Sequence, residues 1–375
     1  MHNRRVLISG ASVAGPTLAY WLHHHGFEPT VVEKAPTIRP GGQAIDIRGT
    51  ALDVTRRMGL LEQARAACTA MRGMSYVDEN GTELFSTTEA TLTGGDVDSP
   101  DIEILRDDLA GILYEATRSN VEYVFDDSIA SLTQHEDHVQ VTFERSAPRT
   151  FDLVVGADGL HSATRALAFG PEADFIHHLG TNLAVFTSEN FLDLDHWQVY
   201  HQTSDGLAGL YSARNNTEAR GMLGFLGQPL GTRDVHAQKR AVAEHFAQAG
   251  WEVPQLIKQL WEAPDFHFDS MSQIVLPSWS AGRVTLVGDA GYCASPLSGQ
   301  GTSLALTGAY VLAGELAAAG GDHVRAFARY EATLRPYVEA NQAFALAMSA
   351  WQQDQSTPQP SIHDVSSLLE LPTYP

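Results

Sequence analysis

The first thirty-five residues constrain the fold more than any other part of this chain. The apolar run "VLIS" at residues 6–9 predicts a buried parallel strand, because such strands are covered on both faces. A glycine-containing turn follows, then a helical pattern of apolar residues that ends at Gly26, then a second strand, "PTVVE". Strand, helix and strand within about thirty residues form a βαβ unit, so we expect an open α/β sheet.

The turn after the first strand has the spacing Gly10-x-Ser12-x-x-Gly15, and Glu33 ends the second strand about twenty residues later. In this context the pattern predicts a dinucleotide site. The first glycine permits the turn, the helix N-terminus faces the pyrophosphate, and the acid accepts a hydrogen bond from a ribose hydroxyl. Ser12 replaces the usual middle glycine. A glycine turn that binds no dinucleotide is the alternative at this point.

A second unusual stretch is "RVTLVGDAGYCASPLSGQGTSLAL", residues 283–306. Its β-branched start predicts a buried strand, and Asp289 then lies at the carboxyl end of that strand, where open α/β sheets bind ligands. The letters "SGQGTS" would begin a helix whose unpaired N–H groups face a negative or electron-rich group. We therefore expect a ligand to lie on this segment.

The charge balance restricts the partners. Formal net charge is −21, which disfavours nucleic acid or an anionic membrane surface. No apolar run reaches the roughly 18 residues of a membrane helix. Cys68 and Cys293 show neither metal spacing nor a disulfide framework, so we expect a cytoplasmic protein without a metal site. The three histidines at 23–25 end a helix, where histidine is favourable, and they lack further metal ligands.

From residue 179 to 274 the sequence changes to short strands followed by two helices. We expect an α/β fold with a Rossmann-like binding domain, an inserted β-sheet substrate domain and a long C-terminal helix. Asn80-Gly81 predicts a hairpin before the insertion. The expected boundaries are residues 1–72, 98–178 and 275–322 for the binding domain, 73–97 and 179–274 for the substrate domain, 323–351 for the helix, and 352–375 for a polar tail that is mobile in part.

Three further motifs follow the dinucleotide turn in a fixed order. Arg106 begins a helix in "LRDDL", Asp158 begins the pattern D-G-x-x-S-x-x-R, and Asp289 is followed by Pro296 and by a Gly-x-Gly pair. With this order, residues 4 to 345 resemble the single-component FAD-dependent aromatic monooxygenases. This is the p-hydroxybenzoate hydroxylase class, which includes polyketide hydroxylases and the tetracycline-inactivating enzymes.

The resemblance implies a non-covalently bound FAD. Arg106 would contact its linking chain, Asp289 its ribityl hydroxyls and Pro296 its isoalloxazine ring, while Asp158 would support the cofactor region and the use of NAD(P)H. Arg48 would contact flavin or substrate, and the alternative is a surface arginine. The implied cofactor-binding residues are Gly10, Ser12, Val13, Ala14, Gly15, Glu33, Lys34, Arg48, Arg106, Asp158, Asp289, Pro296, Gly299, Gly301 and Thr302.

In the resembling enzymes NADPH or NADH reduces FAD, dioxygen adds to the flavin, and a flavin C4a-hydroperoxide hydroxylates an aromatic or polycyclic small molecule. The cofactor supplies this chemistry, so no catalytic side chain is assigned, and Arg48 and Pro296 are the candidates. A flavin-dependent reductase or oxidase on the same fold is an alternative, and a flavin-containing drug-sequestering protein is another. The protein is expected to be a monomer or a homodimer.

Substrate contacts would come from the strands of residues 179–274 and from the loop at Pro296. Alternation along those strands turns about half of their side chains toward a cavity, although aromatic residues there are often part of the core. The candidates are Gln198, Tyr200, Tyr211, Arg214, Phe225 and Pro296.

The chain departs from the family pattern at three points. Tyr292 stands where histidine is usual, Thr302-Ser303 replaces a common asparagine, and Gly308 with its neighbour occupies the region of a usual acid. These changes bear on flavin movement and on substrate type rather than on FAD binding.

Overall fold

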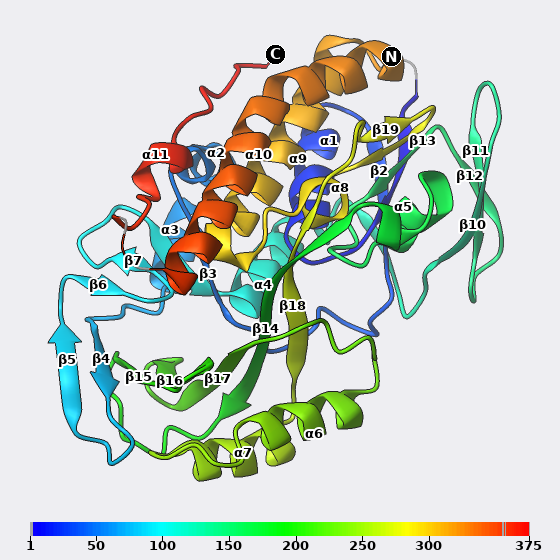
Figure 1. Ribbon diagram of the computed structural model, residues 1–375. Helices are drawn as coiled ribbons and strands as arrows, with labels where there is room; N and C mark the ends of the chain where they lie inside the picture. The colour runs from blue at the N-terminus through cyan, green and yellow to red at the C-terminus, as the bar shows by residue number, and fades with distance from the viewer. Residues whose placement is uncertain (1–2, 355, 357, 375) are drawn as a thin grey trace.

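The computed structural model describes residues 3–354, 356 and 358–374, and a six-stranded sheet forms its centre (Figure 1). In sheet order the strands are β19 (Ser280–Ala281), β20 (Val284–Leu286), β13 (Leu153–Gly156), β1 (Arg5–Ser9), β2 (Glu28–Glu33) and β9 (Glu122–Phe125). All neighbouring pairs except β19–β20 are parallel. The helix α1 (Ala14–His24) joins β1 to β2, so the predicted βαβ unit and Rossmann-like fold are confirmed.

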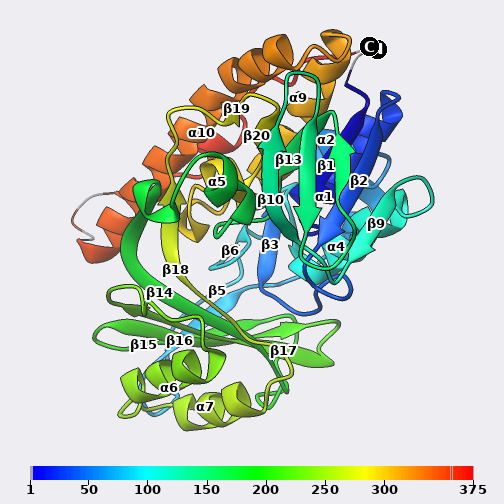
Figure 2. The ribbon, with the colours of Figure 1, turned by 90° about the vertical axis from the view of Figure 1, so that its right-hand side faces the viewer.

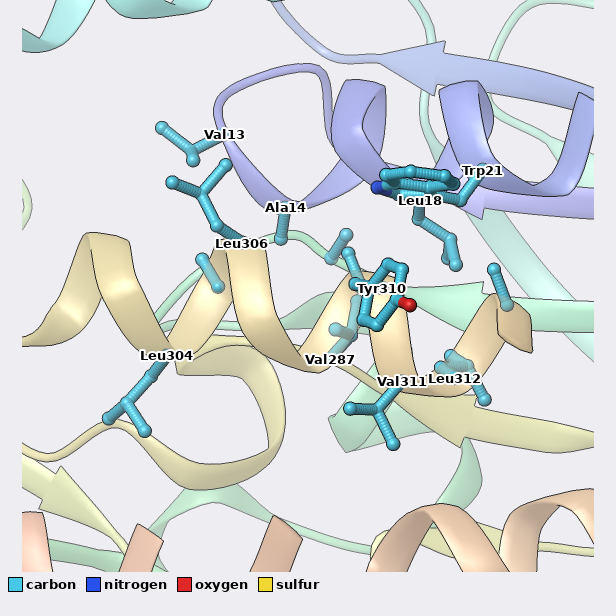
Figure 3. Close-up of a cluster of buried hydrophobic side chains, with 14 of the residues drawn as sticks. Val13, Ala14, Leu18, Trp21, Val287, Leu304, Leu306, Tyr310, Val311 and Leu312 are labelled. Atoms are coloured by element: carbon cyan, nitrogen blue, oxygen red, sulfur yellow. The ribbon is translucent and has the colours of Figure 1, made fainter. Parts of the chain in front are cut away.

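Helices cover one face of this sheet. The helix α9 (Gly301–Ala318) packs against α1 and against the long last helix, α10 (His323–Gln353), which is the predicted C-terminal helix. Small and apolar residues make up most of α9, and nearly all of them are buried. Figure 3 shows α1 and α9 side by side, with the rings of Trp21 and Tyr310 edge to face at a centroid distance of 4.9 Å.

The opposite face of the sheet carries a small antiparallel sheet, seen in Figure 2 beside β1 and β13. Its strands are β10 (Ile129–Gln134), β11 (Val139–Phe143) and β12 (Arg149–Phe151). Successive side chains of β1 serve the two faces alternately: Val6 and Ile8 pack into the helix-side core, and Leu7 packs into the cluster beneath the small sheet. Burial on both faces explains why β1 is a continuous apolar run.

The second large sheet has seven strands and lies below the first in Figure 1. In order these are β18 (His267–Ile274), β14 (Ile176–Ser188), β17 (Glu218–Leu226), β16 (Gly206–Ala213), β15 (Gln198–Gln202), β4 (Met74–Val77) and β5 (Glu83–Thr87). The helices α6 (Val235–His245) and α7 (Val253–Glu262) cover its outer face. The β4–β5 hairpin is the one predicted at Asn80-Gly81, and the domain boundaries along the chain stay predictions.

Short elements lie between or beside the sheets. An antiparallel ribbon of β3 (Ala44–Ile47) and β8 (Ile102–Leu105) leads directly into α4 (Arg106–Thr117). The other short elements are α2 (Thr50–Arg57), α3 (Leu61–Ala66), β6 (Ala90–Thr91), β7 (Gly95–Asp96), α5 (Ala163–Ala168), α8 (Asp289–Tyr292), α11 (His363–Ser366) and the 3-10 helices Glu172–Asp174 and Pro296–Ser298. Within the described residues, no helix is both long and apolar enough to cross a membrane.

The C-terminal segment of residues 362–374 packs against the helices, and the partial mobility expected of the tail stays a prediction. The hydroxyl of Tyr310 donates to the carbonyl oxygen of Pro372 (2.8 Å), and the hydroxyl of Tyr374 donates to the Glu315 carboxylate (2.9 Å). The ring of Tyr374 lies against Gly314 on α9, where a Cβ would overlap it. A few large side chains therefore anchor the end of the polar tail.

Gly314→Ala is expected to lower the melting temperature. Alanine is favoured over glycine inside a helix by about 0.5–1 kcal/mol, so the change would stabilise an open helix surface. Here the added methyl group overlaps the Tyr374 ring, and overpacking of this kind costs about 1–3 kcal/mol. Thermal unfolding followed by circular dichroism measures the effect.

The matched control is Gly314→Ala in a Tyr374→Ala background. Once the ring is removed, the same substitution should raise the melting temperature. A decrease of equal size in both backgrounds would show that the C-terminal segment does not pack on α9 in solution.

Candidate cofactor and substrate site

The turn between β1 and α1 brings two stretches of backbone into close contact. Gly10 has φ +106°, and a Cβ there would lie 2.5 Å from the carbonyl oxygen of Ala157, while a Cβ at Gly15 would overlap the carbonyl oxygen of Gly10. Only glycine fits both positions. Val13 is the N-cap of α1, and no described side chain caps it, so the first N–H groups of the helix are available to an anion. Ser12 is half-buried beside them.

Glu33 lies at the end of β2, against this turn. Its carboxylate accepts hydrogen bonds from the backbone N–H groups of Ala11 (2.7 Å) and Ala35 (2.9 Å). These bonds hold the acid beside the open end of α1, as a ribose contact requires. Lys34, the next residue, is exposed.

Arg106 begins α4 and is 7% exposed. Its Nη2 donates to the carbonyl oxygens of Arg39 (2.7 Å) and Gly41 (2.5 Å), whereas its Nε is buried without a hydrogen-bond partner in the part of the chain that the structure describes. Burial lowers the pKa of Arg106 to about 10. A guanidinium at the start of α4 can contact an anionic oxygen, so Arg106 is compatible with the linking chain of FAD, while its Nε faces Gly42.

Asp289 follows β20 through Gly288, which has φ +66°. Burial raises the pKa of Asp289, because the charged form loses solvation. Its carboxylate faces the start of α9, since a Cβ at Gly301 would lie 3.8 Å from Oδ1. Donors from a polyol would stabilise the ionised form in this position, so Asp289 fits the ribityl chain of FAD.

The loop between α8 and α9 contains the predicted isoalloxazine contacts. Pro296 is exposed and begins a 3-10 helix, and Gly299 ends it with φ +60°. Gln300 is fully buried, and neither atom of its amide group has a partner among residues 3–354, 356 and 358–374. Thr302 lies in the first turn of α9 and is buried. No pattern in the sequence indicated this unpaired amide.

The D-G-x-x-S-x-x-R motif supports the site through the protein interior. Asp158 accepts hydrogen bonds from the N–H (3.0 Å) and the hydroxyl (2.9 Å) of Thr164. Arg165 is fully buried, and its Nη1 donates to the carbonyl oxygen of Ala290 (2.9 Å). The motif therefore braces the segment that carries Asp289.

Two departures from the family pattern explain each other. Tyr292 is buried, and its hydroxyl oxygen lies 2.9 Å from that of Tyr330. A Cβ at Gly308 would overlap the Tyr292 hydroxyl group. The tyrosine at the usual histidine position therefore leaves room only for glycine in the region of the usual acid.

Arg48 is 3% exposed, so the alternative of a surface arginine is wrong. Its guanidinium pairs with the carboxylates of Asp46 (2.9 Å) and Asp101 (3.3 Å). Its backbone N–H donates to the hydroxyl of Ser303 (3.0 Å) in the first turn of α9. The charge of Arg48 is used within the protein, and direct contact with flavin or substrate stays a prediction.

Three carboxyl groups lie near the guanidinium of Arg48: those of Asp46 and Asp101, which pair with it, and that of Glu103. Asp46 and Glu103 are partners across β3–β8. Two threonine hydroxyls donate to Glu103, whereas Oδ1 of Asp46 has no partner in the described chain. Burial raises the pKa of Asp46 to about 8 and also raises that of Glu103. The alternation in "AIDIR" and "IEIL" could have predicted this polar face, because the isoleucines face the core.

Three of the predicted substrate residues lie on the face of the seven-stranded sheet that is turned toward the FAD-binding fold. The hydroxyl of Tyr211 accepts from the N–H of Ala44 (3.1 Å). Oε1 of Gln198 accepts from the hydroxyl of Tyr200 (3.0 Å) and from the N–H of Leu92 (3.1 Å). All three side chains are at most 1% exposed, so they form a fixed polar layer.

The structure corrects the other two predictions from this sheet. Phe225 packs among the residues under α6 and α7, with its ring 4.4 Å from that of His245, because it lies on the opposite face of β17 from Arg220. Arg214 lies in the turn after β16 rather than in a strand, and it pairs with Asp107 and Asp108 of α4, each at 2.7 Å. Sequence alternation could not supply the register that decides the face.

Asp46→Asn is expected to remove part of the pH dependence of stability. An unfolded aspartate titrates near 3.9, and the folded pKa is about 8. Because the folded pKa is raised, the group favours folding fully below the unfolded pKa, and this contribution is lost as the pH rises to the folded pKa, by up to about 1.4 kcal/mol per unit. Urea unfolding across this window measures the slope.

Asparagine keeps the shape and cannot ionise, so the variant should gain stability relative to the parent as the pH rises. The matched control is Asp53→Asn, at an exposed carboxylate on α2. If the unfolding free energy of Asp46→Asn depended on pH as steeply as that of the parent, a raised pKa of Asp46 in the folded protein would be contradicted.

Comparison with known proteins identifies the family. Residues 3–345 match the family described as FAD binding domain. An uncharacterized protein of Mycobacterium tuberculosis (strain ATCC 25618 / H37Rv) is 58% identical over 341 residues, which are 90% of this chain and 92% of that protein. A flavin-dependent monooxygenase of Legionella longbeachae serogroup 1 (strain NSW150) is 41% identical over 349 residues, which are 92% and 89% of the two chains.

A solved structure has a similar fold over the full length of this chain. The crystal structure of tetracycline destructase Tet(55) covers 100% of this chain and 99% of its own, with a TM-score of 0.88 and 41% identity. The end of α1, which no described side chain caps, and the Asp289 carboxylate at the end of β20 fit the FAD that such a domain binds. The chain therefore belongs to the FAD-binding family of flavin-dependent monooxygenases, in the p-hydroxybenzoate hydroxylase class.

Proposed function

We propose that this enzyme uses NADPH or NADH together with dioxygen to hydroxylate an aromatic or polycyclic small molecule. The likeness to tetracycline destructase Tet(55) carries the proposal, because it extends over the seven-stranded sheet from which substrate contacts would come. A tetracycline-like polycycle is therefore the first substrate to test. When bound, FAD supplies the redox chemistry and activates dioxygen.

The chain would bind the cofactor at three points along the carboxyl edge of the six-stranded sheet. The N-terminus of α1 would hold the diphosphate, and the guanidinium of Arg106 would contact the linking chain of FAD. Glu33 would accept from the adenosine ribose while it keeps its two backbone donors, since a carboxylate has about four lone-pair sites. Asp289 would accept from the ribityl hydroxyls, which would offset the cost of its burial.

The substrate would lie against the polar layer of the seven-stranded sheet. Burial raises the pKa values of Tyr200 and Tyr211, so both phenols keep their protons near neutral pH and can orient a substrate without serving as bases. The loop at Pro296 would present carbonyl groups and a fixed shape, because proline has no N–H and a restricted φ. Positioning and exclusion of water are thus the expected contributions of the protein.

The test is an NADPH-oxidation screen over phenols, polyketides and tetracyclines, with mass analysis of each compound that stimulates oxidation. The proposal expects a product with one added oxygen atom. Stimulated oxidation that yields only a reduced or desaturated compound would favour the reductase or oxidase alternative. Tight drug binding without stimulated oxidation would favour the sequestering alternative.

Asp289→Ala is expected to weaken FAD binding. The ribityl hydroxyls lose a charged acceptor, and hydrogen bonds to charged groups contribute about 1.5–3 kcal/mol, which corresponds to roughly tenfold to a hundredfold in Kd. Fluorescence titration of the apoprotein with FAD measures the change. Asp289→Asn keeps one acceptor oxygen, so its FAD affinity should lie between those of the parent and of Asp289→Ala. Equal FAD affinity in all three proteins would contradict the role given to this acid.

Pro296→Gly is expected to uncouple turnover while FAD content stays normal. The freed loop would let the substrate shift relative to the flavin, and a shift of about 1 Å can cost on the order of a hundredfold in rate. NAD(P)H oxidation should continue while hydrogen peroxide replaces hydroxylated product. The test measures hydrogen peroxide and hydroxylated product per NAD(P)H consumed. Full coupling in this variant would mean that the polar layer of the sheet, rather than the Pro296 loop, positions the substrate.

A further inference from the structure

Residues 39–43, which we call the 39–43 loop, run between α4 and the seven-stranded sheet. The loop joins β2 to β3, and both of its central residues are buried glycines, Gly41 at φ +72° and Gly42 at φ +113°. Such angles are readily adopted only by glycine. The loop therefore has a backbone shape that neighbouring side chains must hold in place.

The first turn of α4 holds the loop from the side of the FAD-binding fold. Nη2 of Arg106 donates to the carbonyl oxygens of Arg39 and Gly41, and the N–H of Gly41 donates to Oδ2 of Asp107 (2.8 Å). The position of the Arg106 guanidinium, and hence of its unpaired Nε, depends on where this loop lies.

The seven-stranded sheet holds the loop from the other side. Asp265, just before β18, accepts through Oδ1 from the N–H of Thr187 in β14 (2.8 Å) and through Oδ2 from the N–H of Gly42 (3.3 Å). Nε of Arg220 in β17 donates to the carbonyl oxygen of Gly42 (3.1 Å). Both polar groups of Gly42 are thus bonded to the sheet that would bind substrate.

The contact between Asp265 and the loop leaves no free space. A Cβ at Gly41 would overlap the Asp265 carboxylate, and a Cβ at Gly42 would lie 2.6 Å from Nε of Arg106. The Asp265 carboxylate is also close enough to act on Arg106. Burial lowers the pKa of Arg106, and the carboxylates of Asp107 and Asp265 oppose that shift. A movement of the sheet relative to α4 must therefore either move Gly42 or break its bond to Asp265.

We propose that Asp265 is a positioning residue that couples the substrate sheet to the flavin through the 39–43 loop and Arg106. The coupling rests on the proposed function, because it concerns the effect of bound substrate on flavin reduction. A substrate that shifts β14 or β18 changes the geometry at Gly42, and Gly41 passes the change to Arg106. Without the Asp265 carboxylate, a shift of the seven-stranded sheet would no longer move Arg106.

The first experiment needs no substrate and measures the Kd of FAD by fluorescence titration of the apoprotein. Gly41→Ala should weaken FAD binding by about tenfold or more in the parent chain, because the methyl group forces the loop off Asp265. In an Asp265→Gly background the collision is gone and only the strain of the positive φ remains, so the same substitution should weaken FAD binding clearly less than in the parent chain. Equal effects in the two backgrounds would overturn the proposal.

The second experiment is anaerobic stopped-flow reduction of FAD-saturated enzyme by NADPH, with and without a compound that the screen has shown to be hydroxylated. In Asp265→Asn, the ratio of the two reduction rates should fall by about tenfold, since the side chain keeps its size and loses its charge. The matched control is Asp195→Asn, an exposed acid paired with Arg72, which should keep the parental ratio. A parental ratio in Asp265→Asn would also overturn the proposal.

If Asp265→Asn does not fold, Asp265→Ser takes its place. The ratio of its reduction rates with and without substrate should fall in the same way. The two experiments also separate this inference from the proposed function. If no compound stimulates reduction of the parent enzyme, the proposed function fails, and the FAD affinities of the Gly41 and Asp265 variants alone decide the coupling between Asp265 and the cofactor site.

Discussion

The close backbone contact at the turn between β1 and α1 is the constraint on which the site depends. Gly10 and Gly15 lack Cβ atoms, so α1 begins directly against the ends of β1 and β13 with an uncapped N-terminus. Parallel strands end at the same edge of a sheet, so β2 brings Glu33 and β20 brings Asp289 to this edge as well. Topology and two missing side chains therefore shape the edge where the dinucleotide is expected to bind.

Several buried polar groups have no hydrogen-bond partner in the described part of the chain. An unpaired buried polar group costs about 1–3 kcal/mol. In the described part of the chain, Nε of Arg106, the amide of Gln300 and Oδ1 of Asp46 are of this kind. Nε of Arg106 faces the 39–43 loop, and burial raises the pKa of Asp46, which favours its protonated form.

Sequence patterns predicted the features that depend on backbone geometry. The apolar run of β1, the glycine spacing and the hairpin at Asn80-Gly81 each follow from local rules, and the structure confirms them. Side-chain direction in the seven-stranded sheet needed the register between strands, so Phe225 was assigned to the wrong face and Arg214 to a strand that it follows. Contacts between distant segments, such as Tyr374 with Gly314, left no local signal. The cofactor roles assigned by motif stay predictions.

The most direct measurement is the isotopic origin of the oxygen in a product formed from tetracycline or another polycycle with NADPH under isotope-labelled dioxygen. A flavin-dependent monooxygenase transfers one atom of dioxygen to its substrate, so mass spectrometry should find one labelled oxygen atom in each product molecule. Product that carries only unlabelled oxygen from water, or NADPH consumption that converts all dioxygen to hydrogen peroxide with every compound tested, would contradict hydroxylation as the function of this chain.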